Sequence, residues 1–119
     1  MKKIQKFLKA FPYAFKGIVS GFQERNMKFH GIAALVVLWL GWYVQLDLAE
    51  WIVILVLIGL LWSAELVNTA IEELANIVRD ELDLDYQATK RARDTAAGAV
   101  LVLATASVII GSLIFIPKF

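Results

Sequence analysis

Residues 51–76 read WIVILVLIGLLWSAELVNTAIEELAN, an apolar run that passes directly into residues with carboxylate and amide side chains. The uncharged part, residues 51–64, has 14 residues, fewer than the roughly 20 that a helix needs to cross a bilayer. The helix reaches that length only if it continues through Glu65 and Glu72. We therefore predict a membrane-spanning helix over residues 51–78 with acidic groups in its inner half.

The composition of the 119-residue chain is typical of a membrane protein. Apolar residues make up 60% of it and charged residues 19%, whereas soluble domains are about 45–50% apolar. Two further apolar stretches predict spanning helices over residues 29–46 and 95–117. An acidic turn at residues 47–50 and a polar connection at residues 79–94 would join the three spans. The sequence thus predicts a single all-α integral membrane domain with three transmembrane helices.

The basic residues are distributed unevenly along the chain. Of the 12 Lys and Arg residues, seven precede the first span and four lie in the connection at residues 79–94, which leaves Lys118 alone near the C-terminus. Because cytoplasmic segments of membrane proteins carry an excess of Lys and Arg, the N-terminus and this connection are predicted to be cytoplasmic. The turn at residues 47–50 and the C-terminus would then lie outside.

The first 28 residues differ in kind from the three spans. Their apolar side chains recur at helical spacing with lysines largely between them, so one face of a helix is apolar and the other basic. This pattern predicts an amphipathic helix and a turn over residues 1–28, with the helix lying on the membrane surface. Pro12 should kink or restart that helix, because proline removes a backbone hydrogen bond. The spacing of Gly17 and Gly21 is a weak sign of close helix packing.

The middle span carries a narrow polar stripe. On a helix that turns about 100° per residue, one side collects five polar side chains: Glu65, Asn68, Thr69, Glu72 and Asn76. Each carboxylate at the centre of a membrane helix costs about 2.5–3.5 kcal/mol, so a cation, a proton, a basic partner or a wet cavity must compensate. Alternatively, Glu72 and Glu73 simply lie in the cytoplasmic headgroup region.

The chemistry of this stripe points to phosphoryl transfer. Mg²⁺ is commonly held by one or two carboxylates together with substrate phosphates, and a remaining carboxylate can act as a general base. Lys9, Lys16 and Arg93 could neutralise phosphate oxygens from the cytoplasmic side. The chain has no cysteine and neither a P-loop nor a Rossmann fingerprint, which excludes thiolate chemistry and a standard nucleotide site.

A proton- or ion-translocating membrane subunit is the alternative function from another class. Intramembrane Glu65 and Glu72 would also serve a proton relay. That function leaves the basic N-terminal segment without a role, whereas a kinase uses it to neutralise phosphate. We therefore favour a kinase that acts on an alcohol held in the bilayer.

Two segments carry a resemblance to a known family. The runs ELVNTAIE at residues 65–72 and RDTAAGAV at residues 93–100 resemble the signature of the small prokaryotic diacylglycerol kinase family. ERN at residues 24–26, FH at 29–30 and IIGSLIFIP at 109–117 resemble its undecaprenol kinase branch. The resemblance implies a homotrimeric kinase of the bacterial inner membrane that uses MgATP. Its acceptor would be undecaprenol, with diacylglycerol as the alternative, and no nucleic-acid partner is expected.

The resemblance also implies roles for individual residues. By position, Glu65 would be the general base that takes the proton of the lipid hydroxyl, and Asn68 would support the site by hydrogen bonding. Glu24 and Glu72 would hold the Mg²⁺ that bridges the ATP phosphates. The remaining positions implied to contact ATP or the lipid head group are Lys6, Lys9, Tyr13, Lys16, Arg93 and Asp94.

Two residues of the chain depart from the family's usual pattern. Arg93 stands where the family usually has lysine, which exchanges a compact ammonium for a wide planar fork. Asn76 stands where it usually has aspartate, which removes a negative charge near the metal. Separately, His30 is expected to be a hydrogen-bonded boundary residue and not a metal ligand.

Small residues recur every seven positions in the last span. They form two adjacent rows: Ala97, Ala104 and Gly111, and Gly98, Thr105 and Ser112. Such rows allow another helix to approach closely. That helix could belong to another subunit, as a trimer requires, or to the same chain.

Overall fold

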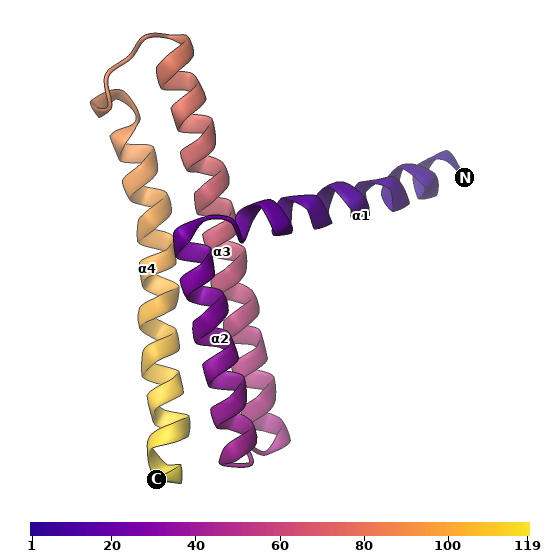
Figure 1. Ribbon diagram of the computed structural model, residues 1–119, viewed down its shortest axis with the longest axis vertical. Coiled ribbons are helices and arrows are strands. Elements are labelled where there is room, and N and C mark those ends of the chain that lie inside the picture. The colour runs from indigo at the N-terminus through magenta and orange to yellow at the C-terminus, as the bar shows by residue number, and fades with distance from the viewer.

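The structure of the protein, a computed structural model, describes all 119 residues, and all of its regular elements are helices. The elements are α1 (Lys2–Gly21), α2 (Arg25–Tyr43), α3 (Leu48–Glu81), α4 (Gln87–Phe115) and the short 3₁₀ turn η1 (Ile116–Lys118). The prediction of an all-α chain is therefore confirmed. Helices α3 and α4 lie side by side, α2 lies against the first half of α3, and α1 leaves the bundle at a steep angle (Figure 1).

Two of the helices are long and apolar enough to cross a membrane: α3, and α4 together with η1. At a rise of 1.5 Å per residue, the 34 residues of α3 extend about 51 Å, well beyond a hydrocarbon core of about 30 Å. The end of α3 and the start of α4 accordingly run past the level at which α1 leaves the bundle (Figure 1). The first predicted span corresponds to α2, whose 19 residues extend about 28 Å.

The predicted polar connection at residues 79–94 is mostly helical. Only residues 82–86 lie outside α3 and α4. The backbone N–H of Leu84 donates to the carbonyl of Arg79 at 2.8 Å, and Asp83 adopts a φ of 51° to make the turn. Charged residues such as lysine, arginine and glutamate are good helix formers. The polar residues of this segment therefore extend α3 and α4 instead of ending them. The charged ends of α3 and α4 therefore form a helical hairpin.

A short turn at the opposite end joins α2 to α3. Asp47 caps α3: its side chain accepts a hydrogen bond from the Glu50 N–H at 2.8 Å, and Oε1 of Glu50 accepts one from the Asp47 N–H at 3.1 Å. A Cβ atom at Gly41 would meet the Trp51 and Leu46 side chains at 2.8 and 2.9 Å. The missing side chain at Gly41 therefore lets α2 approach the start of α3 closely.

Helix α1 runs without interruption from Lys2 to Gly21 with Pro12 inside it. The expected restart at Pro12 does not occur, because the helix is exposed and water can satisfy the carbonyl that proline leaves unpaired. At its other end, a Cβ atom at Gly21 would lie 2.2 Å from Cδ2 of Leu66. The end of α1 therefore packs directly on α3, one residue from Glu65.

The single chain has a small core. Eleven of the 119 residues are buried, and most large apolar side chains of all four helices are exposed. Met27, at the start of α2, is fully buried where α2 meets the bundle. A chain with this much exposed apolar surface needs lipid or further protein around it.

Candidate active site

The polar stripe of α3 is present in the structure and its first two members are buried. Glu65 is 3% exposed and Asn68 is 4% exposed. Nδ2 of Asn68 donates a hydrogen bond to Oε1 of Glu72 at 3.2 Å, while Oδ1 of Asn68 is buried without a partner. The stripe therefore contains two carboxylates and an unsatisfied acceptor along about two turns of α3, an arrangement that a donor from a ligand would complete.

Helix α2 packs against one side of the polar stripe. Nε2 of His30 lies 3.7 Å from Oε2 of Glu65, and the Asn26 side chain also lies beside that carboxyl group. Nε1 of Trp62 donates to the carbonyl of His30 at 3.3 Å, which fixes the start of α2 against α3. Asn26 was not among the residues predicted for the site. The expectation that His30 is only a boundary residue missed its position beside Glu65.

Glu24 lies at the N-cap of α2 with an exposed side chain that makes no capping hydrogen bond. It precedes Asn26, whose side chain lies beside the Glu65 carboxyl group, by two residues. No group of three or more His, Cys, Asp or Glu side chains lies close enough to hold a metal ion. Mg²⁺ usually keeps water and substrate phosphates as ligands and needs only one or two carboxylates. Exposed Glu24 and half-buried Glu72 fit that kind of open site.

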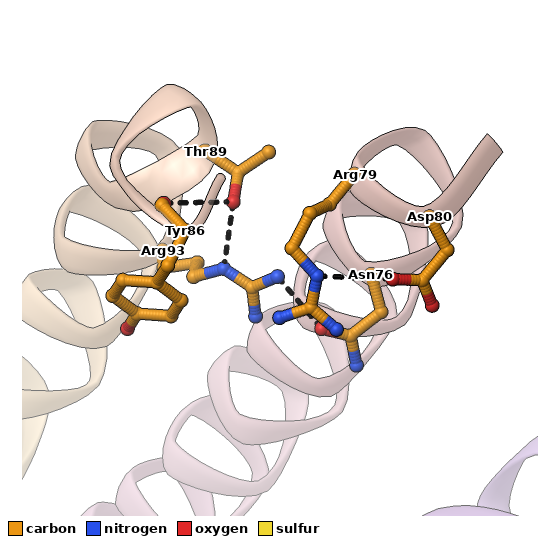
Figure 2. A network of polar contacts seen from close by, with 6 residues as sticks. All are labelled: Asn76, Arg79, Asp80, Tyr86, Thr89 and Arg93. Atoms are coloured by element: carbon orange, nitrogen blue, oxygen red, sulfur yellow. Dashed lines mark hydrogen bonds and ion pairs between the residues drawn. The ribbon is translucent and has the colours of Figure 1, made fainter. Parts of the chain in front are cut away.

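Arg93 and Asp94 lie at the start of α4 but bond to different partners. Nη2 of Arg93 donates to Oδ1 of Asn76 on α3 at 2.6 Å, and its Nε donates to Oγ1 of Thr89 at 3.0 Å (Figure 2). Asp94 instead pairs with Nζ of Lys90 at 2.5 Å. The hydrogen bond and the charge of Asp94 raise the pKa of the Lys90 ammonium above its ordinary value. The two departures from the family's usual pattern, at positions 76 and 93, are thus in direct contact.

The four predicted nucleotide contacts on α1 lie away from the stripe. Lys6, Lys9 and Tyr13 line one shallow hollow of the helix, and Nζ of Lys16 lies 5.7 Å from the centre of the Tyr13 ring. Because α1 leads away from the bundle (Figure 1), the single chain does not bring these side chains together with Glu65.

An apolar groove of about 530 Å³ runs between α2, α3 and α4. Most of its lining is hydrophobic, and its lining near the stripe includes His30 and Trp62. His30, which lines the groove, also lies 3.7 Å from the Glu65 carboxylate. A hydrocarbon chain that lay in this groove could present a hydroxyl group to Glu65.

The chain belongs to the prokaryotic diacylglycerol kinase family, whose sequence profile matches residues 12–115. This confirms the resemblance inferred from the segments at residues 65–72 and 93–100. The protein is therefore a membrane-associated lipid kinase that takes its phosphate from ATP.

Two relatives refine the comparison. The chain is 44% identical over 117 residues to the undecaprenol kinase of Bacillus subtilis (strain 168), covering 98% of this chain and 93% of that protein. It is 31% identical over 111 residues to the diacylglycerol kinase of Synechocystis sp. (strain ATCC 27184 / PCC 6803 / Kazusa), covering 92% of this chain and 62% of that protein. No solved structure matches the chain.

Proposed function

We propose that this protein transfers the γ-phosphoryl group of ATP to undecaprenol at the cytoplasmic face of the bacterial inner membrane, and that it works as a homotrimer with Mg²⁺. The observation that carries the proposal is the burial of the Glu65 carboxylate beside His30, which lines an apolar groove. A lipid alcohol must bring its hydroxyl group to a base while its hydrocarbon stays out of water. The groove and the carboxylate together meet both requirements.

In the proposed reaction Glu65 takes the proton of the lipid hydroxyl as that oxygen attacks the γ-phosphorus. The new bond joins the lipid oxygen to phosphorus, the bond from phosphorus to the β–γ bridging oxygen breaks, and ADP leaves. Asn68 orients the Glu72 carboxylate through the hydrogen bond between their side chains. Glu24 and Glu72 would hold Mg²⁺, which supplies positive charge to the phosphate oxygens.

Undecaprenol is proposed over diacylglycerol because the relative with the higher identity, which also aligns over nearly its whole length, is an undecaprenol kinase. Both alcohols place a hydroxyl group at the interface with hydrocarbon beneath it. The groove between α2, α3 and α4 suits either kind of hydrocarbon, so the acceptor rests on the comparison and not on the groove.

The direction of α1 supports an assembly of more than one copy. Lys6, Lys9, Tyr13 and Lys16 are carried away from the stripe of their own chain (Figure 1). A nucleotide that contacts both these side chains and Glu72 therefore needs a second copy of the chain. In the proposed trimer, α2, α3 and α4 cross the membrane, α1 lies on its cytoplasmic surface, and the C-terminus lies outside.

The test offers the purified protein, in nanodiscs, γ-labelled ATP and Mg²⁺ with undecaprenol and diacylglycerol in equal amounts. The expected result is label in undecaprenyl phosphate. Label only in phosphatidic acid would overturn the acceptor, and label in neither lipid would overturn the function. Mass measurement of the protein in the same nanodiscs checks the trimer.

A further inference from the structure

The guanidinium group of Arg93 is held on three sides at the hairpin between α3 and α4. Nη2 donates to Oδ1 of Asn76 at 2.6 Å and Nε donates to Oγ1 of Thr89 at 3.0 Å. The guanidinium carbon lies 5.1 Å from the centre of the Tyr86 ring. Figure 2 shows these partners arranged around Arg93 from both helices. The side chain is therefore fixed before any ligand arrives.

Thr89 is itself held in place. Its side chain is buried, with the residue 8% exposed, and its hydroxyl donates to the carbonyl of Tyr86 at 3.3 Å. A hydroxyl has one hydrogen to donate, and this one is directed at the carbonyl. The oxygen of Thr89 is thus turned toward Nε of Arg93 as an acceptor. The hydroxyl group sets the direction in which the fork points.

None of the partners of Arg93 neutralises its charge. Asn76 offers an amide oxygen and Thr89 a hydroxyl oxygen, and both are neutral. Arg93 has no ion pair in the chain, whereas its neighbour in Figure 2, Arg79, pairs with Asp80 at 3.1 Å. Asp94, which follows Arg93 directly, pairs with Lys90. Arg93 thus keeps its full positive charge at the end of the hairpin.

The fork also keeps donors free. Arginine has about five N–H donors in a rigid plane, and two of them serve Asn76 and Thr89. The other three are free to bind oxygens of an anion, and a planar fork binds phosphate through two parallel hydrogen bonds. Asn76 follows Glu72 by one helical turn on the polar stripe, so a phosphate at Arg93 would lie next to the proposed magnesium site.

We propose that Asn76 and Thr89 are positioning residues that hold the Arg93 fork, charged and partly free, to receive the phosphate oxygens of ATP. This inference rests on the proposed function of the same site. It gives the amide at position 76 a role: its neutral oxygen accepts a hydrogen bond from the guanidinium group and leaves the positive charge of that group unpaired. A carboxylate there would anchor the fork more firmly and weaken its attraction for phosphate.

The test separates anchoring from charge with two variants measured for KM of ATP, KM of lipid, kcat and thermal midpoint. Asn76→Asp keeps an acceptor oxygen and adds a negative charge, so the KM of ATP should rise about tenfold, as expected for a changed hydrogen bond to a charged group, while the thermal midpoint holds or rises. Thr89→Val removes the acceptor and should raise the KM of ATP by a similar factor. In both variants the KM of lipid should stay unchanged.

Two further variants complete the design. Thr89→Ser retains the hydroxyl and should restore the wild-type KM of ATP. Thr95 lies on the same helix, and its hydroxyl donates to the Arg91 carbonyl at 2.7 Å and not to Arg93. Thr95→Val removes this hydroxyl and should leave the KM of ATP unchanged. If the contact between Asn76 and Arg93 only stabilised the fold, the KM of ATP would be unchanged in Asn76→Asp, and that result would overturn the proposal. If the wild-type protein phosphorylates no lipid, the proposed function fails instead, before any variant is compared.

Discussion

Nε2 of His30 lies 3.7 Å from Oε2 of Glu65, so α2 and α3 meet at the one buried carboxylate of the chain. This distance is longer than a hydrogen bond. The imidazole therefore lies beside the carboxylate without forming a hydrogen bond to it. A hydroxyl group that approaches Glu65 therefore has no hydrogen bond from His30 to displace.

Replacing Glu65 with glutamine should abolish lipid phosphorylation and leave the fold intact. Glutamine has nearly the same shape but cannot take a proton, and general base catalysis contributes about 100- to 10,000-fold in rate. We expect kcat to fall by about this factor with the KM of ATP little changed. Steady-state kinetics in nanodiscs measures the effect, and the elution volume in detergent reports the assembly. Turnover close to that of the wild type would contradict the assignment of the base.

Glu72→Gln should weaken the apparent affinity for Mg²⁺ without removing the hydrogen bond from Asn68. The glutamine keeps an Oε1 oxygen that can accept the Asn68 hydrogen bond, but it loses the charge that attracts a cation. Even residues behind the metal ligands are worth about 10- to 100-fold in metal affinity, so the Mg²⁺ concentration for half-maximal activity should rise at least about tenfold. A magnesium titration of activity measures it.

The next residue supplies the matched control for this prediction. Glu73 is exposed, and Glu73→Gln removes the same charge from the same helix. Its magnesium titration should overlay that of the wild type. Equal shifts in both variants would mean that only the general negative potential of the helix matters, and Glu72 would lose its assignment as a ligand.

The stripe on α3 could be predicted because it depends only on the helical period. Once the middle span is a helix, Glu65, Asn68 and Glu72 must share a side, and the Asn68–Glu72 hydrogen bond is a contact between residues one turn apart. The family also follows from local sequence, since its signature lies in short continuous runs. No knowledge of tertiary packing was needed for either result.

Contacts between helices could not be predicted in the same way. The contact of His30 with Glu65 depends on the length of the turn after α2, and the contact of Arg93 with Asn76 depends on the five residues that join α3 to α4. A shift of one residue in the position where α3 or α4 begins would turn a side chain of that helix by about 100° relative to its neighbour. The direction of α1 is likewise set by the close packing of Gly21 on Leu66.

Gly21→Ala should loosen α1 from the bundle, whereas Gly17→Ala should not. A Cβ atom at Gly21 would lie 2.2 Å from Cδ2 of Leu66, and nothing lies within 4 Å of one at Gly17. Overpacking of this kind costs about 1–3 kcal/mol, reduced here to the extent that the Leu66 side chain can turn away. At Gly17, alanine should stabilise the helix by up to about 1 kcal/mol. The thermal midpoints of the two variants in detergent measure the difference, and equal midpoints would contradict the packing.

The far end of the bundle offers a test that involves stability alone. Oε1 of Glu50 accepts hydrogen bonds both from the Asp47 N–H at 3.1 Å and from Nζ of Lys118 at 2.9 Å. The pair is half-exposed, and such pairs contribute about 0.2–1 kcal/mol. Lys118→Met should therefore destabilise the protein by that small amount. Glu50→Gln keeps the oxygen that completes the cap and should cost no more.

Asp47→Ala removes the N-cap of α3 and should cost more, about 0.5–2 kcal/mol. In the double variant Lys118→Met with Glu50→Gln, the second change should add almost nothing, because the ion pair is already lost. Unfolding in detergent measures all four proteins against the wild type. Full additivity of the two changes would mean that the contact between Lys118 and Glu50 does not stabilise the protein. Lipid phosphorylation by the folded fraction should be equal in every variant, since these residues lie at the opposite end of α3 from the hairpin that holds Arg93.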